Sequence, residues 1–202
     1  GSGSGGSIFI DAGSISGSAT TTVNAVGSGG KGGSISIFAG SGTYTGTTQA
    51  FGSSQTAGTI FQKIGSSAKG ALTIDNNSQA TTWRTDVSLL SDNDVSLDSI
   101  AIKSALVTLR TDGDAPTVDI SGTSQVKFQN TQGNAGVTIK SNATVTLENA
   151  STTLMKFGSF IMEATSTLKH INHSTLHTDS INIQAVTITV PSTAAIDVNA
   201  AG

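Results

Sequence analysis

The 202-residue chain contains no cysteine, only two prolines and few charged or aromatic side chains. The absence of cysteine excludes disulfides and thiolate metal sites. Charged residues make up 11% of the chain and the net charge is −3, which gives no electrostatic case for nucleic acid, whose binders usually carry a basic face. No apolar run reaches the roughly 18 residues of a membrane-spanning helix, so we expect no membrane insertion.

Serine, threonine and glycine are abundant instead. Serine and threonine are the most frequent polar residues, and the hydrophobic fraction is 36%. That fraction is below the usual value for a globular domain. Disorder is not the expected outcome, because the charge is too low and β-branched residues are too many. A solenoid fits this composition, since few apolar side chains fill the thin cross-section of one coil.

Residues 117–135 and 136–154 align with each other as two segments of equal length. They read TVDISGTSQVKFQNTQGNA and GVTIKSNATVTLENASTTL, so that Val118 aligns with Val137 and Val126 with Val145. Each segment holds two apolar-x-apolar pairs, and alternation places both members of a pair on one face of a strand. A period of about 20 residues is typical of a solenoid. The alignment predicts an inward-facing stacked core of Val118, Ile120, Val126, Phe128, Val137, Ile139, Val145 and Leu147.

The whole chain, 1–202, is expected to form one continuous solenoid, with Gly-rich irregular coils in 1–65 and regular coils in 66–202. The first part holds most of the glycines. Within it, GGSIFIDAG at 5–13 matches GGSISIFAG at 32–40, which predicts a coil with a loop insertion near 14–22. We expect coils of about 19–23 residues. No stretch shows sustained helical spacing, so almost no α-helix is expected.

The two glycine-bounded strands and the two aligned segments together resemble filamentous-haemagglutinin-like exoproteins, the large bacterial surface proteins of two-partner secretion. The chain is also similar to autotransporter passengers. This resemblance implies an all-β fold, a single-stranded right-handed parallel β-helix. It also implies an extracellular or cell-surface location, where such proteins are displayed as long fibres or adhesins.

A few residue clusters could bind metal, and each has a simpler interpretation. His170, His173 and His177 could hold zinc or copper, but neighbouring histidines of a strand face opposite sides, so solvent-facing residues near a corner are expected. Two acidic clusters could offer oxygens to calcium, although neither follows an EF-hand or nonapeptide pattern; they are Asp92, Asn93, Asp94 and Asp98, and separately Asp112 and Asp114. We expect no metal, no cofactor and no catalytic residue.

Two alternatives to a structural role stay open. Parallel β-helices also occur among carbohydrate-active enzymes, whose hydrolases need paired carboxylates, and Asp112 with Asp114 is the conceivable pair. The chain lacks the Gly-His-Gly and Arg-Ile-Lys elements of polygalacturonases. A glycan-binding or glycan-cleaving protein is therefore the main alternative. Ice binding is the minor one, because Thr-x-Thr pairs recur at 144/146, 165/167 and 187/189.

The sequence favours a structural, non-enzymatic segment of an extracellular fibre or adhesin. Its expected partners are neighbouring coils of a longer parent chain or further copies placed end to end, and possibly host or matrix glycans. The first expected apolar strand, Ile8-Phe9-Ile10, lies close to residue 1, and Ile196 with Val198 forms a last apolar pair shortly before residue 202. We therefore expect both termini to be cuts through a continuing rod.

Overall fold

The computed structural model describes residues 3–67, 69–79, 82–89, 97–112, 116–132, 135–148, 154–171 and 181–198. Within these ranges the chain is all β, without a helix. Its coils stack through parallel strands, which confirms the predicted β-solenoid. The chain divides into two compact units, Gly1–Thr85 with Val95–Leu106, and Asp86–Asp94 with Val107–Gly202.

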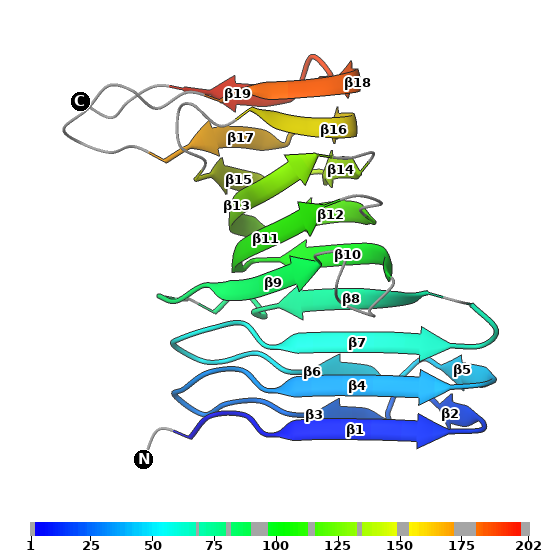
Figure 1. The fold of residues 1–202 in the computed structure, drawn as a ribbon. Coiled ribbons are helices and arrows are strands. Elements are labelled where there is room, and N and C mark those ends of the chain that lie inside the picture. Colours follow the sequence, from blue (N-terminus) through cyan, green and yellow to red (C-terminus); the bar gives the residue numbers. More distant parts are fainter. Residues whose placement is uncertain are drawn as a thin grey trace. The chain divides into compact units, whose positions relative to one another are not determined.

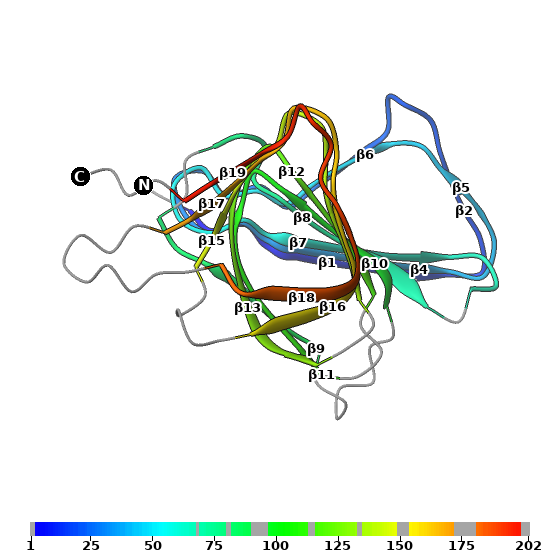
Figure 2. The ribbon, with the colours of Figure 1, turned by 90° about the horizontal axis from the view of Figure 1, so that it is seen from above.

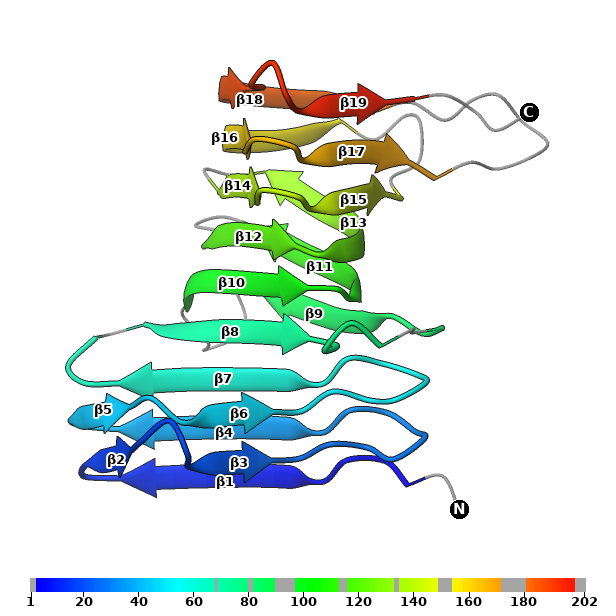
Figure 3. The ribbon, with the colours of Figure 1, turned by 180° about the vertical axis from the view of Figure 1, so that it is seen from behind.

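In the first unit, three long strands stack in parallel on one side and shorter strands lie behind them. The order β1, β4, β7 forms the long face (Figure 1), while β2 pairs with β5 and β3 with β6 in the layer visible in Figure 3. The strands of this unit are β1 (Ser7–Ala12), β2 (Ile15–Gly17), β3 (Thr22–Asn24), β4 (Ser34–Ala39), β5 (Gly42–Tyr44), β6 (Thr47–Gln49), β7 (Thr59–Ile64), β8 (Gly70–Asp75) and β10 (Leu97–Lys103).

The loop insertion expected near 14–22 is instead part of the regular coil. Strands β2 and β3 fall in and beside this segment and pair with the next coil. Coils with this extra layer are longer than expected, because Ile8 pairs with Ile35, 27 positions on, and Ile35 with Ile60, 25 positions on. Ile35 and Ile37 are fully buried in a core that also contains Ala25, Ala50 and Ile60.

Glycine fills the edge of the first unit where backbones cross closely. A Cβ added to Gly33 would lie 2.2 Å from the carbonyl oxygen of Gly6 and 2.5 Å from that of Ala25. The amide of Gly33 also donates a hydrogen bond to the Ala25 carbonyl oxygen, at 3.0 Å. The glycine-rich composition of residues 1–65 therefore has a steric cause at this edge.

The parallel series reverses once in the first unit. Strand β8 runs antiparallel to β7, with Phe61 opposite Leu72, and β10 then runs parallel to β8. The turn between β7 and β8 includes Gly65, whose φ of 89° favours glycine. The parallel β-helix expected over residues 1–202 therefore contains a reversal at this point. The reversal coincides with the change of composition near residue 66.

In the second unit, the coils have three sides around one core, as the view along the stack shows (Figure 2). Strands β12, β14, β16 and β18 stack along one side, and β13, β15, β17 and β19 along another. The strands are β9 (Thr85–Leu89), β11 (Leu106–Asp112), β12 (Thr117–Ser121), β13 (Thr123–Gln132), β14 (Gly136–Ile139), β15 (Thr144–Leu147), β16 (Met155–Met162), β17 (Thr167–His170), β18 (Ile183–Thr189) and β19 (Ala195–Asp197).

The predicted core of the second unit is confirmed. Its eight side chains are at most 3% exposed: Val118, Ile120, Val126, Phe128, Val137, Ile139, Val145 and Leu147. The predicted pairing of Val118 with Val137 of the next coil is also confirmed. Val137 pairs in turn with Phe160, so these residues form one continuous column.

The alignment of 117–135 with 136–154 is wrong for the next side of the same coil. Val126 pairs with Leu147, and Val145 lies beside Ser124. Two residues turn the corner after Ile120, whereas four turn it after Ile139. A shift of two residues leaves every apolar side chain on its original face, so the core pattern hides the change in register.

Candidate functional site

The coil formed by β18 and β19 exposes apolar side chains that continue the core columns of the second unit. Ile188 pairs with Phe160 and Ile196 with Leu168. Phe160 and Leu168 are at most 2% exposed, whereas Ile188 is 53% and Ile196 50% exposed. These residues therefore occupy core positions without being covered.

A hollow of about 500 Å³ lies at this exposed coil. It is lined by eight apolar side chains, Phe160, Leu168, Ile181, Ile183, Ile188, Val190, Ile196 and Val198. Among the described residues, β18 is paired with β16 and β19 with β17, and each has no strand at its other edge. Free strand edges and uncovered apolar side chains together form a surface that a further β-coil can continue. We call this surface, β18 and β19 with the hollow, the open coil.

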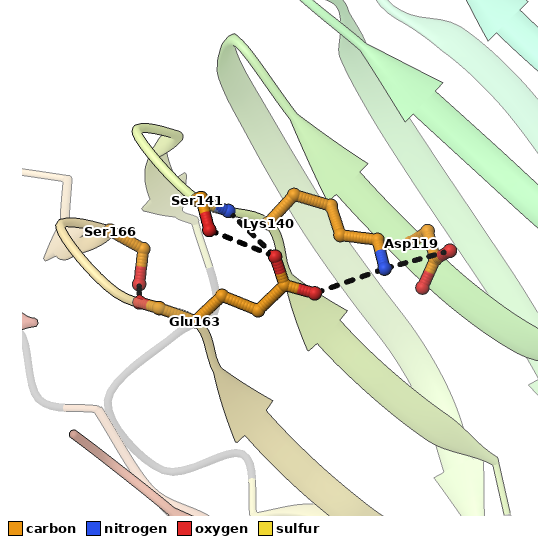
Figure 4. A network of polar contacts seen from close by, with 5 residues as sticks. All are labelled: Asp119, Lys140, Ser141, Glu163 and Ser166. Atoms are coloured by element: carbon orange, nitrogen blue, oxygen red, sulfur yellow. Dashed lines mark hydrogen bonds and ion pairs between the residues drawn. The ribbon is translucent and has the colours of Figure 1, made fainter.

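A charged network lies at a corner of the same unit, where β14 and β16 end (Figure 4). The Lys140 Nζ atom lies 3.1 Å from Glu163 Oε1 and 3.4 Å from Asp119 Oδ2. The second oxygen of Glu163 accepts hydrogen bonds from the backbone amide of Ser141 at 3.0 Å and from its hydroxyl at 3.1 Å. The ion pairs of Lys140 with Asp119 and Glu163 therefore link three successive coils.

The electrostatics of this network argue for a structural role. The hydrogen bond with Glu163 raises the pKa of Lys140 above its ordinary value. The backbone amide of Ser141 lowers the pKa of Glu163. Both shifts keep the two groups charged at neutral pH, whereas a general acid or base works best with a pKa near the operating pH.

Of the three histidines, His170 alone lies in the described residues, and His173 and His177 lie outside them. His170 pairs with Leu147 in the column that begins at Val126, and it is half-buried rather than solvent-facing. Its Nδ1 atom lies 2.8 Å from the Ile171 carbonyl oxygen and its Nε2 atom 3.0 Å from that of Val198. Both ring nitrogens face backbone carbonyl oxygens, and a neutral imidazole donates a hydrogen bond to one of them.

The acidic clusters fall mostly outside the described residues, namely Asp92, Asn93, Asp94 and Asp114. Asp98 accepts a hydrogen bond from the Ser67 hydroxyl at 3.1 Å. Asp112 ends β11, and its side chain is not described. Within the described ranges, no three His, Cys, Asp or Glu side chains gather closely enough to hold a metal ion.

The three Thr-x-Thr pairs do not form one stacked array. Thr144 pairs with Thr167, but Thr146 pairs with Lys169. The third pair lies on β18, where Thr187 lies beside Ser159 and not beside either of the other pairs. Thr165 lies in a corner between β16 and β17 with a φ of 59°. The regular face on which the ice-binding alternative depends is therefore not built from these residues.

An aromatic row on the first unit was not recognised from the sequence. The ring centroids of Phe9 and Phe38 are 5.5 Å apart, and those of Phe38 and Phe61 are 5.1 Å apart. Each phenylalanine directly follows an inward-facing isoleucine, so it points away from the core of β1, β4 and β7. Phenylalanine at the position between two inward residues, as in Ile8-Phe9-Ile10, was the available signal.

No family model, curated protein or solved structure matches this chain. Within the described ranges, no helix is long and apolar enough to cross a membrane.

Proposed function

We propose that this chain is a structural segment of an extracellular surface fibre or adhesin, in which a further β-coil covers the open coil. The observation that supports this proposal is the uncovered core position of Ile188, which is 53% exposed although its partner Phe160 is buried. Complete burial of a side chain of this size contributes about 1.5–3 kcal/mol. Several such side chains line the open coil, so covering it is favourable.

The edges of β18 and β19 that face no other described strand define the chemistry of the covering partner. Strand edges of this kind accept further strands. A matching partner presents strands along two sides of a coil, with apolar side chains turned inward. Neighbouring coils of a longer parent chain fit this description, as do further copies placed end to end.

The test is the association of the purified chain across a hundredfold dilution series, followed by light scattering. We expect particle mass to rise with concentration. Ile188→Asp places a charge in the open coil and should strongly reduce the rise, while Thr187→Asp, on the same exposed strand but beside Ser159, should leave it unchanged. A particle that is monomeric at every concentration would remove the support for a stacked fibre segment.

The proposed cell-surface location needs its own measurement. Antibodies raised against the purified chain should label intact cells of the source, without permeabilisation. Labelling that requires permeabilised cells would place the protein inside and contradict an extracellular fibre.

The absence of catalysis stays a prediction, and glycan cleavage is its alternative. We expect a panel of polysaccharides to stay intact when incubated with the purified chain. Turnover that disappears in Asp112→Asn would assign a glycan-cleaving role and overturn the structural one.

A further inference from the structure

The outer face of β1, β4 and β7 carries aromatic and charged side chains in alternating columns. In one column, Phe9 pairs with Ser36, which pairs with Phe61. In the next column, two residues along each strand, Asp11 pairs with Phe38, which pairs with Lys63. Phe38 therefore lies between a carboxylate and an ammonium group. We call these two columns the aromatic face.

The aromatic face is exposed, and its charges have no ion-pair partner in the part of the chain that the structure describes. Phe9 is 69% exposed, and Phe38 and Phe61 are half-buried by their neighbours. Among the described residues, neither Asp11 nor Lys63 has an ion-pair partner. Aromatic side chains are enriched in protein interfaces, so the exposed rings mark this face as a candidate contact surface, and the charges beside them can set its orientation.

The charges of the aromatic face are complementary to those of the same face in a second copy. A two-fold axis parallel to β4 exchanges the positions of β1 and β7 but keeps each position along the strands. Under this rotation Asp11 comes opposite Lys63 of a second copy, and Lys63 opposite its Asp11. Phe38 meets the same residue of the second copy, and Phe9 meets its Phe61. Each residue thus finds a compatible partner.

We propose that the aromatic face pairs with the aromatic face of a second copy about this two-fold axis. Contacts of this kind, in which the same patch is used by both subunits, are the rule in symmetric dimers. Two sheets packed face to face lie about 10 Å apart with their strands nearly aligned. The charge pattern favours a second copy, because opposite charges at the two ends of the Phe38 column are complementary to the same column in reverse order.

The size of the face indicates a weak association. A strand of six residues is about 20 Å long, and three neighbouring strands span about 10 Å. This is smaller than a standard protein interface, so the dimer belongs with weak, transient contacts. The two ion pairs mainly fix the orientation and exclude other partners. The inference depends only on the first unit and is independent of the proposed role of the open coil.

A charge-exchange experiment tests the proposal. All variants carry Ile188→Asp, so that association through the open coil does not contribute, and sedimentation equilibrium is measured across a dilution series. Asp11→Lys alone places two lysines opposite each other, and Lys63→Asp alone places two aspartates opposite each other. We expect each single variant to dimerise at least about tenfold more weakly than the parent, a loss of about 1.4 kcal/mol.

Two further samples should recover the dimer. In the double variant Asp11→Lys with Lys63→Asp, the charges are exchanged but again complementary. In an equimolar mixture of the two single variants, each contact joins a lysine of one copy to an aspartate of the other, so a heterodimer forms more readily than the homodimer of either variant. Phe9→Ser removes an exposed ring and should weaken the dimer without altering the circular dichroism spectrum.

Three results would overturn the proposal. The first is an Ile188→Asp parent, with its aromatic face unaltered, that stays monomeric at the highest concentration. The second is single charge variants that dimerise as the parent does. The third is a mixture that fails to recover association although both variants are folded. Binding of the monomer to a glycan array, lost in Phe9→Ser, would assign the aromatic face to sugars instead.

Discussion

The Lys140 Nζ atom lies 3.1 Å from Glu163 Oε1, across two neighbouring coils of the second unit. Other pairs of opposite charges also join neighbouring coils. Lys169 lies beside Asp197 at 3.8 Å, and in the first unit Lys103 lies beside Asp75 at 3.9 Å. Opposite charges in successive coils favour the correct stacking register, because like charges directly opposite each other destabilise a sheet.

The first prediction concerns this pair and pH. Because the pKa of Glu163 is lowered on folding, its contribution to stability is complete above the ordinary value of 4.5 and is lost as the pH falls through the folded value. Because the pKa of Lys140 is raised, its contribution is complete below 10.5 and is lost as the pH rises through the folded value.

Thermal melts of the parent, Glu163→Gln, Lys140→Gln and the double variant should therefore give a coupling between the two residues at pH 7. The coupling should be small, because both side chains are more than a third exposed to solvent, at 39% and 37%. It should weaken as the pH falls through the folded pKa of Glu163. A coupling that stays constant from pH 7 down to the pH at which the chain unfolds in acid would contradict the pairing of two charges.

The second prediction concerns the core column of Val137. Val137→Asp places a charge in a position that is 1% exposed and flanked by Val118 and Phe160. An unpaired buried charge costs several kcal/mol. Thr146→Asp is the control, because Thr146 is half-buried and lies beside Lys169. Urea unfolding should separate the two variants widely, and a Val137→Asp variant as stable as the control would mean that this residue does not face the core.

The third prediction concerns the corner at Thr165. Its φ of 59° is a left-handed conformation that a β-branched residue rarely adopts. Thr165 also donates a hydrogen bond to Asn142 Oδ1 at 2.7 Å. Asparagine tolerates this conformation and keeps a donor, so Thr165→Asn should stabilise the chain by about 0.5–1 kcal/mol.

Thr167→Asn is the matched control for this corner. Thr167 lies in β17, where the backbone is extended and threonine is favoured. Calorimetry should show a higher Tm for Thr165→Asn and a lower one for Thr167→Asn. A fall in Tm for both variants would show that the corner gains nothing from asparagine.

The fourth prediction concerns the glycine edge of the first unit. Gly33→Ala would bring a Cβ within 2.2 Å of a carbonyl oxygen of the neighbouring backbone, which has no room to move. We expect a loss of about 2 kcal/mol or more. Gly6→Ala is the control, because no atom lies within 4 Å of the added Cβ. Similar denaturation midpoints for the two variants would contradict the close crossing of backbones at Gly33.

The sequence by itself determined the class of fold and the inward face of most strands. Alternation of apolar and small polar residues, as in Val118 and Ile120, sets which side chains turn inward, because successive residues of a strand face opposite sides. Repetition of the pattern then indicates stacked coils. The pattern was less informative for Phe9, since it stands between Ile8 and Ile10 and all three are apolar.

The tertiary structure alone decided the register beyond each corner and the composition of the exposed surfaces. Pairing of Val126 with Leu147 instead of Val145 depends on the number of residues in a corner, and a shift of two leaves the alternation unchanged. Reversal of the chain between β7 and β8 likewise leaves the apolar pattern of each strand intact. The aromatic face and the open coil exist only where residues of different coils lie side by side, which no single strand can specify.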